Sequence, residues 1–462
     1  MMTATLRIEL RTMRSRLPEG KGHASARPLR ALLTTVAVVA LSIGLAHPAY
    51  GTAGALDPAF GLGGKVRTDF SSRTDIANGV AIQADGKLVV AGASGGGSKF
   101  AVARYNPDGS LDTTFSGNGK LTTDFTPHVD YANDLAIQSD GKIVVVGESG
   151  VGVGSNPKFA VARYNSDGSL DTTFGGDGRV TTDFTRHEDL AHGVAIQADA
   201  KIVAVGTRAA DPGLDSRFAL ARYNPDGSLD ATFGGDGRVT TNLTRRGDLI
   251  FWGVAIQPNG RIVVAGVAGS CPTCNSRFAL ARYELDGSLD ATFGGDGKVT
   301  TDLTRRSDPA YDVTLQADGK IVVAGDAGEF VGPNPGTFAL ARYHRSGTLD
   351  ETFSGDGKVR TDLTRFDDGP SRVAIQTDGK IIVAGVAGYG GANAKFALLR
   401  YRVAGRLDAG FSADGKLVTD FTAHADYANG LTLQGDGKIV AAGVAGEGGS
   451  NPKFAVARYL AA

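Results

Sequence analysis

Short apolar runs separated by turn residues follow one another along most of this chain. In a representative stretch, Gly193–Gln197 and Lys201–Gly206 are β-branched runs on either side of a tight turn. Phe218–Tyr223 and Ser228–Phe233 flank an Asn-Pro-Asp-Gly turn, in which Pro presets φ and Gly supplies a positive φ. The pattern predicts two hairpins, and therefore four strands A to D in order, in this stretch.

The same stretch occurs seven times. Each copy contains Leu-Asp-x-x-Phe, then Gly-Lys-Val-x-Thr-Asp or a close variant, then a hairpin around Asp-Gly-Lys, then Phe-Ala-x-x-Arg-Tyr. The Leu-Asp pairs begin at Leu56, Leu111, Leu170, Leu229, Leu289, Leu349 and Leu407. A repeat of this length built from short strands indicates a repeat architecture.

The second strand of each repeat is apolar at nearly every position, as in Ile262–Ala265. Both faces of such a strand must be covered, which neighbouring sheets stacked face to face achieve. Seven four-stranded sheets around one axis form an all-β, seven-bladed β-propeller. We expect the Leu and Phe of Leu-Asp-x-x-Phe to fill the contacts between blades.

The two ends of the repeat region suggest how the ring closes. The first repeat begins with a fourth strand, Leu56–Phe60, and the last ends on a third strand, Phe454–Tyr459. We expect the first to complete the last blade and so remove a free sheet edge. In the alternative register, Lys-Val-x-Thr-Asp is the innermost strand and every blade is continuous in sequence.

One turn departs from the others. The turn between the first two strands contains Gly in six repeats but Ala200 in the third. A left-handed backbone costs a non-glycine residue on the order of 1 kcal/mol. The sequence therefore predicts local strain at Ala200.

The combination of Leu-Asp-x-x-Phe-Gly-x-x-Gly-Lys-Val-x-Thr-Asp, Asp-Gly-Lys-Ile-Val-Val-Ala-Gly and Phe-Ala-Leu-Ala-Arg-Tyr-Asn-x-Asp-Gly-Ser resembles the delta-60 repeat. This is a bacterial β-propeller repeat family of unknown function. The apolar hairpin also looks, more loosely, like the inner hairpin of NHL-type propellers. Both resemblances imply a propeller, and they leave function open.

Residues 1–50 differ from the rest. Seven Lys and Arg against two Glu precede the uncharged stretch Ala31–Ala46, which is followed by small residues. This order is typical of a secretory signal peptide with cleavage after Ala46, Gly51 or Ala53. A membrane anchor is the alternative, but the uncharged stretch has only sixteen residues, and a spanning helix needs about 20 apolar residues. We expect a processed N-terminus over 1–50, a propeller over 51–462, and a secreted, extracellular, periplasmic or cell-surface protein without membrane insertion after cleavage.

Charge and cysteine content narrow the function further. Without residues 1–50 the chain has 41 basic and 47 acidic residues, a net charge of −6. This balance is the opposite of what a general nucleic-acid binder needs. Cys271 and Cys274 lie three positions apart in a loop, so a local disulfide is favoured over a redox or zinc site.

The strand directions place the loops between the second and third strands, and the connections to the next repeat, on one face. This loop face contains nearly all the variation between repeats, and loops on a rigid scaffold are where binding sites usually lie. An Asp lies at the same position of that face in each repeat. These residues are Asp75, Asp130, Asp189, Asp248, Asp308, Asp368 and Asp426. They either ring the channel mouth and bind Ca²⁺ or, in the favoured interpretation, accept N–H groups of their own turns.

Two further features of the loop face are candidates for binding. Arg186, Arg245, Arg305 and Arg365 occupy one position in four consecutive repeats and either bind an anionic partner or pair with local Asp residues. Phe251 and Trp252, with one extra residue in their repeat, either contact a sugar or peptide or pack between blades.

Catalytic signals are weak. His128, His187 and His424 lie near the Asp positions, but no nucleophile motif or phosphate-binding loop accompanies them. The sequence favours a monomeric, non-catalytic binding platform for a protein or glycan at the cell surface, with no cofactor other than Ca²⁺ at the Asp positions. The alternative is a metal-assisted hydrolase or lyase at the channel mouth.

Overall fold

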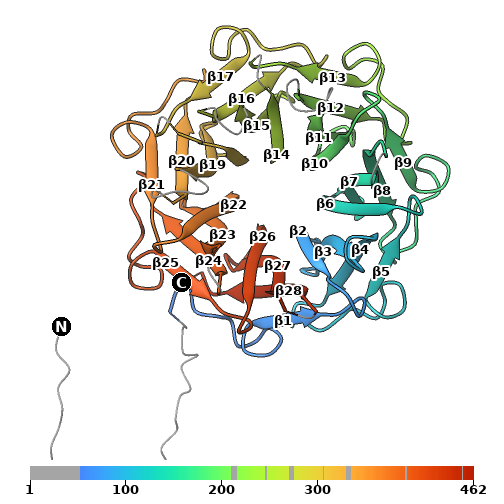
Figure 1. The fold of residues 1–462 in the computed structure, drawn as a ribbon, viewed down its shortest axis with the longest axis horizontal. Coiled ribbons are helices and arrows are strands. Elements are labelled where there is room, and N and C mark those ends of the chain that lie inside the picture. The colour runs from blue at the N-terminus through green and yellow to red at the C-terminus, as the bar shows by residue number, and fades with distance from the viewer. Residues whose placement is uncertain are drawn as a thin grey trace, which may run out of the picture. The chain divides into compact units, whose positions relative to one another are not determined.

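The computed structural model describes residues 52–461 except 153–154, 210–215, 245–246, 270–274, 305, 329–334, 391–392 and 450. The described residues form seven four-stranded antiparallel sheets and no helix. Within these ranges, no helix is long and apolar enough to cross a membrane. The sheets are arranged radially around a central axis (Figure 1). The predicted all-β, seven-bladed propeller is confirmed.

Four strands of different burial make up each blade, and we number the blades by their innermost strands. The innermost strands are β2 (Ile76–Ile82), β6 (Val129–Ile137), β10 (Asp189–Ile196), β14 (Asp248–Ile256), β18 (Ala310–Leu315), β22 (Asp367–Ile375) and β26 (Ala425–Leu433). The second strands are β3 (Leu88–Ser94), β7 (Ile143–Val151), β11 (Ile202–Arg208), β15 (Ile262–Ala268), β19 (Ile321–Ala327), β23 (Ile381–Tyr389) and β27 (Ile439–Glu447). The second strands are almost wholly buried, as their unbroken apolar pattern predicts.

The third strands are β4 (Lys99–Tyr105), β8 (Lys158–Tyr164), β12 (Arg217–Tyr223), β16 (Arg277–Tyr283), β20 (Thr337–Tyr343), β24 (Lys395–Tyr401) and β28 (Lys453–Tyr459). The outermost strands are β1 (Lys65–Thr68), β5 (Lys120–Thr123), β9 (Arg179–Thr182), β13 (Arg238–Thr241), β17 (Lys298–Thr301), β21 (Lys358–Thr361) and β25 (Lys416–Thr419).

The outermost strand corrects the predicted strand assignment. Lys-Val-x-Thr, and not Ser228–Phe233, forms the fourth strand of a blade, and it lies outermost and not innermost as in the alternative register. Leu229 makes only an isolated bridge to Tyr223. The Asp and Phe of Leu-Asp-x-x-Phe instead contact the Arg of the third strand, as Asp230 and Phe233 contact Arg222. This segment therefore forms a turn and adds no strand to the sheet.

That contact is a clamp repeated in every blade. Asp112 accepts a hydrogen bond from Arg104 Nε at 2.8 Å, and the Arg104 guanidinium lies 4.7 Å from the centroid of the Phe115 ring. Arg104 Nη1 also donates to the backbone oxygen of Ser166 in the next blade. Phe115 is fully buried in an interblade cluster. The Phe of the motif therefore fills the contact between blades, as predicted.

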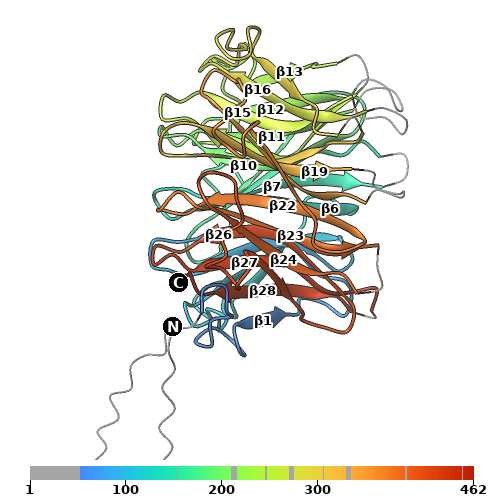
Figure 2. The ribbon, with the colours of Figure 1, turned by 90° about the vertical axis from the view of Figure 1, so that its left-hand side faces the viewer.

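The last blade combines the two ends of the described chain. β1 pairs with β28 over four residues, from Lys65 opposite Ala457 to Thr68 opposite Phe454. β1 lies beside β28 in both views (Figures 1 and 2). The strand at this position is thus Lys65–Thr68, whereas Leu56–Phe60 was predicted; Leu56 makes a single bridge to Tyr459.

Ala200 has the left-handed backbone that its turn predicts, with φ of 64°. Replacing Ala200 by glycine is expected to raise the free energy of unfolding by about 1 kcal/mol, because glycine removes the left-handed penalty. Thermal and chemical unfolding of both proteins measure this change. Gly141→Ala, at the same turn of blade 2 with φ of 84° and open space around it, is the reciprocal control and should lose a similar amount. An unchanged or lower stability of Ala200→Gly would contradict the prediction that Ala200 is strained.

Candidate functional site

A β-bulge interrupts every innermost strand. The pairing register shifts at a corresponding point of each strand, next to Ala77, Ala132, Ala191, Ile250, Ala310, Pro370 and Ala428. A second shift lies at the start of β6, β22 and β26. The residues that the shift leaves unpaired are Asn78, Asn133, His192, Phe251 with Trp252 and Gly253, Tyr311, Ser371 and Asn429. Bulges re-aim side chains and are frequent beside functional sites. Near the axis, the blades therefore differ in the type of residue at the bulge.

In blades 7, 1 and 2 the bulge side chain is an asparagine with a structural role. Asn429 Nδ2 donates to Ala77 O at 2.9 Å, Asn78 Nδ2 to Ala132 O at 2.8 Å, and Asn133 Nδ2 to Ala191 O at 2.9 Å. Each bond joins one innermost strand to the next. Blades 3 to 6 lack this asparagine, so their bulge side chains are available for another use.

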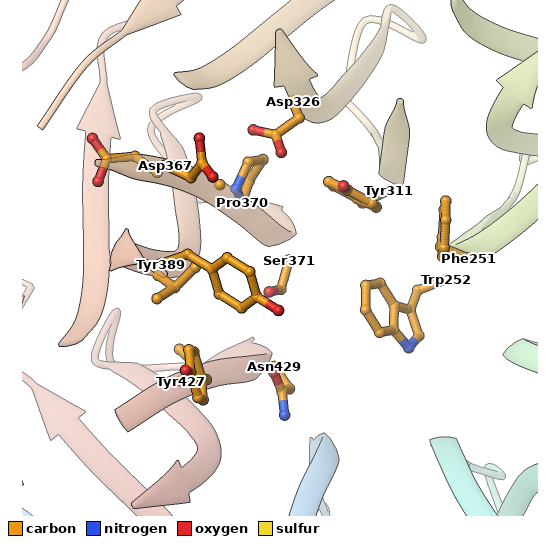
Figure 3. A pocket seen from close by; sticks show the side chains of 14 residues that line it. Phe251, Trp252, Tyr311, Asp326, Asp367, Pro370, Ser371, Tyr389, Tyr427 and Asn429 are labelled. Atoms are coloured by element: carbon orange, nitrogen blue, oxygen red, sulfur yellow. The ribbon is translucent and has the colours of Figure 1, made fainter. Parts of the chain in front are cut away.

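A cavity of about 260 Å³ lies where these bulges differ. We call it the axial pocket. Its lining side chains come from blades 4 to 7 (Figure 3) and include Phe251, Trp252, Tyr311, Asp326, Asp367, Asp368, Ser371, Tyr389, Tyr427 and Asn429. Asp326 lies near the end of β19, Asp367 at the start of β22 and Tyr389 at the end of β23. The pocket therefore opens towards the loop face.

Five aromatic rings dominate the lining. The Phe251 and Tyr311 rings meet edge to face, with centroids 5.0 Å apart at 66°. The ring centroids of Trp252 and Tyr311 lie 6.2 Å apart, and those of Tyr389 and Tyr427 lie 5.8 Å apart. These separations are within the range of favourable aromatic pairs. The rings stabilise one another and present their remaining surfaces to the cavity.

Asp326 is the unusual polar group of the pocket. Its side chain is only 6% exposed, and its Oδ1 has no hydrogen-bond partner among the residues that the structure describes. Burial, reinforced by the nearby carboxylates of Asp367, Asp368 and Asp308, raises the pKa of Asp326 well above its usual value, and a hydrogen bond from Tyr311 opposes that shift only in part. A buried carboxyl with a perturbed pKa in a cleft is a functional-site candidate.

Arg372 lies beside the pocket and spans the axis. Its guanidinium is 5.1 Å from the centroid of the Trp252 ring, and its Nη2 is 3.1 Å from Asp134 Oδ1 in blade 2. Its Nε donates to Asn429 O at 3.1 Å. Burial raises the pKa of Asp312 to about 6, and the positive charge of Arg372 opposes this shift in part. Arg372 thus fixes one face of Trp252 and balances two buried carboxylates.

His192 completes the axial side chains on the blade 3 side. Burial, with a smaller contribution from the positive charge of Arg372, lowers the pKa of His192 to about 4. Its Nδ1 lies 3.5 Å from Asn133 Nδ2, and its ring centroid lies 6.4 Å from that of Phe251. The neutral imidazole therefore serves as a packing neighbour of the aromatic lining.

The seven predicted Asp positions do not form a shared ring of ligands. Each carboxylate is fully buried and accepts backbone N–H groups of its own connection; Asp75, for example, accepts from Phe70 N at 2.9 Å. In several blades the other oxygen accepts from the end of the second strand or the residue after it, as Asp368 does from Gly388 N near the end of β23 at 2.8 Å. Among the described residues, no group of three or more His, Cys, Asp or Glu side chains is arranged to hold a metal ion. The favoured local interpretation fits this geometry, and of the seven only Asp368 also lines the axial pocket.

The other predicted residues are placed as follows. Phe251 and Trp252 do line the pocket. Arg186 and Arg365 are exposed on the loop face, with Arg365 stacked 5.0 Å from the Phe366 ring. Arg245, Arg305, Cys271 and Cys274 lie outside the described residues. His128, His187 and His424 are exposed and do not line the pocket.

Sequence reasoning missed most of the polar and aromatic lining, namely Tyr311, Asp326, Arg372, Tyr389, Tyr427 and Asn429. A column-by-column comparison of the repeats contains a signal for some of them. Tyr311 occupies the position of Asn78, and Asp326 occupies a strand position that is Ala93 in blade 1. Such departures from the scaffold residue type mark the pocket.

The chain is similar to known proteins in its repeats and, at low identity, in its fold. No curated protein sequence matches the chain. A catalytically inactive virginiamycin B lyase from Staphylococcus aureus, solved with quinupristin, has a TM-score of 0.50 at 10% identity over 85% of this chain and 98% of that one. The polysaccharide lyase Uly1 has a TM-score of 0.47 at 11% identity over 83% and 89%. An α-L-arabinanase from Penicillium chrysogenum, complexed with arabinobiose, has a TM-score of 0.46 at 10% identity over 70% and 91%.

At these identities the similarity to solved structures concerns the fold alone. The repeats themselves identify the family. The description "Domain of unknown function (DUF5122) beta-propeller" matches residues 83–115, 138–174, 197–233, 257–293, 316–353, 376–411 and 434–461, which is more than half of the chain. The chain therefore belongs to the DUF5122 beta-propeller family.

Proposed function

We propose that the protein is a non-catalytic binding module that receives a protruding group of a surface glycan or protein partner in the axial pocket. The observation that supports this most is the convergence of five aromatic side chains from four consecutive blades on one cavity at the loop face. Aromatic anchors around a concave site, with a few polar groups among them, are typical of ligand recognition.

The lining suits a small group with one apolar face. Trp252 and Tyr311 offer ring surfaces, while Ser371, Asn429 and Asp367 supply hydroxyl, amide and carboxylate groups at the edge. A cavity of about 260 Å³ is smaller than the sites that enclose drug-sized ligands. The pocket therefore suits one sugar unit or one side chain of a larger partner, whose remaining contacts fall on the surrounding loops.

The proposal places the protein outside the cytoplasm, as a secreted or cell-surface monomer, because of the signal-like segment over 1–50. The catalytic alternative, a metal-assisted hydrolase or lyase, has less support. It requires the seven Asp carboxylates to converge, and their oxygens are engaged by backbone groups within their own blades.

Replacing Trp252 by alanine is expected to weaken binding of the partner about thirtyfold, because a buried aromatic anchor contributes ~2 kcal/mol or more to such a site. Glycan arrays and partner capture identify the ligand with the unaltered protein, and calorimetry then compares the variants. Leu285→Ala removes a large apolar side chain that is 55% exposed at a turn on the opposite face, and it should bind normally. Equal affinities of Trp252→Ala and the unaltered protein would refute the pocket as the binding site.

A further inference from the structure

The axial pocket is lined by carboxyl groups that no described basic side chain pairs with. Asp326, Asp367 and Asp368 line it, and Asp308 is close enough to affect Asp326. Asp367 Oδ1 accepts from Gly336 N at 2.9 Å, and Asp368 accepts from its own turn, but Asp326 Oδ1 has no partner within the described ranges. Arg372, which lies beside the pocket, is directed to Asp134 and to the Trp252 ring. A buried carboxylate with one oxygen left without a hydrogen bond is costly, and a ligand that supplies a positive charge would offset that cost.

The backbone around Asp326 is shaped to admit this carboxylate. A Cβ built on Gly369 would lie 3.2 Å from Asp326 Oδ1, and one built on Gly336 would also lie 3.2 Å from it. Both are closer than ordinary side-chain contacts allow, so glycine at these two positions gives the carboxylate its room. In Figure 3 the Asp326 carboxylate points towards Tyr311 and Pro370, at the edge of the aromatic lining.

The aromatic rings complete a site for a particular kind of cation. The face of an aromatic ring attracts a positive charge, and several rings around one cavity recognise ammonium groups that carry alkyl substituents. A bare metal ion needs converging oxygen or nitrogen ligands, and the described residues contain no such group. The mixture of apolar surface and a single deeply buried carboxylate therefore favours an organic cation.

We propose that the axial pocket recognises an alkylammonium or protonated amine group of its ligand, with Asp326 as the counter-charge and Phe251, Trp252 and Tyr311 as the aromatic walls. This inference rests on the proposed function, since it names the chemical class of the group bound there. A pocket of this kind selects amine-bearing glycan units or basic side chains over neutral sugars.

Choline and 3,3-dimethylbutan-1-ol test the charge directly, because the two molecules have nearly the same shape and only choline is positive. Trp252 is the only tryptophan of the chain and lines the pocket, so its fluorescence in the full protein reports occupancy. We expect choline to bind about tenfold or more tightly than the alcohol at about pH 8.

The matched variants are Asp326→Asn and Glu148→Gln. Glu148 occupies the same position of the second strand in blade 2, opposite Phe159 as Asp326 is opposite Phe338, and it lies outside the pocket. Asp326→Asn should reduce the preference for choline to within about twofold while thermal unfolding shows a folded protein. Glu148→Gln should leave the preference unchanged.

The pH dependence follows from the groups that face Asp326, which are Asp308, Tyr311, Asp367 and Asp368. Because burial and these carboxylates raise the pKa of Asp326, protons compete with the cation, and the choline preference should grow as the pH rises. Equal binding of choline and the alcohol, or an unchanged preference in Asp326→Asn, would overturn the cation assignment even if Trp252→Ala abolishes binding of the natural partner. Normal binding of that partner by Trp252→Ala would overturn the proposed function, and with it the cation assignment.

Discussion

Replacing Arg372 by methionine is expected to lower the free energy of unfolding by about 3–5 kcal/mol, the cost of removing one partner of a buried ion pair. Arg372 is 7% exposed, and its Nη2 lies 3.1 Å from Asp134 Oδ1 across the axis. Asp312, 9% exposed, is the second buried carboxylate that the guanidinium stabilises. Chemical unfolding of the two proteins measures the difference.

The stability that Arg372→Met loses should depend on pH in a defined direction. Burial raises the pKa of Asp134, and it raises that of Asp312 to about 6, while Arg372 opposes both shifts. A carboxyl whose pKa is higher in the folded state contributes stability at acid pH that is lost as the pH rises through that value. Removing Arg372 raises both pKa values further. The penalty of Arg372→Met should therefore be smaller near pH 5 than near pH 8.

Two controls separate this pair from a general effect of losing an arginine. Arg372→Met combined with Asp134→Asn should recover part of the stability, because no charge is then left unpaired at that position. Arg179→Met breaks a surface pair with Asp177, which is 55% exposed, and should cost less than about 1 kcal/mol. A penalty for Arg372→Met that equals that of Arg179→Met, and does not vary with pH, would contradict the structural role of the axial pair.

The blade count and the fold were predictable because their determinants are local and repeated. Apolar second strands such as Ile262–Ala265 occur in every copy, and the turn before them contains Gly in six of the seven. The outermost strand was misassigned because Lys-Val-x-Thr has only four residues, a short run for recognition from sequence. Ser228–Phe233 resembled a strand although Asp230 and Phe233 are used to clamp Arg222.

The candidate site was predictable only in part. Phe251 and Trp252 stood out because their repeat has an extra residue, which the structure accommodates in a longer bulge. Asp326 and Arg372 could not be placed from sequence, since groups of other blades surround them: Arg372 pairs with Asp134, 238 positions away, and Asp326 faces Asp367 and Asp368 of the next blade. The Asp positions were easier, because their N–H donors lie four and five residues away on the same turn.

Removing the N-terminal residues through Thr68 is expected to abolish cooperative unfolding, because the deletion removes the outer strand of the last blade. β28 would lose its four pairs with β1 and expose a sheet edge to other chains. Arg458, 4% exposed, would lose the Asp57 carboxylate that accepts from its Nε at 2.8 Å and the Phe60 ring beneath it. An unpaired buried arginine alone costs about 3–5 kcal/mol, a large part of the stability of a typical domain.

The matched control is a chain that begins at Thr52, which retains β1 and every contact described above and should unfold with the same midpoint as the full chain. A circular permutant offers the sharper test. Leu460 N donates to Ala55 O at 2.9 Å, so residues 52–68 joined by a flexible linker after Ala462 can reach the same place. Because this permutant makes the last blade continuous in sequence, it should regain a sharp thermal transition and lose the light scattering of the deletion. If the deletion alone melts as sharply and at the same temperature as the full chain, pairing with β1 contributes nothing to stability, and a six-bladed or three-stranded terminal arrangement is sufficient.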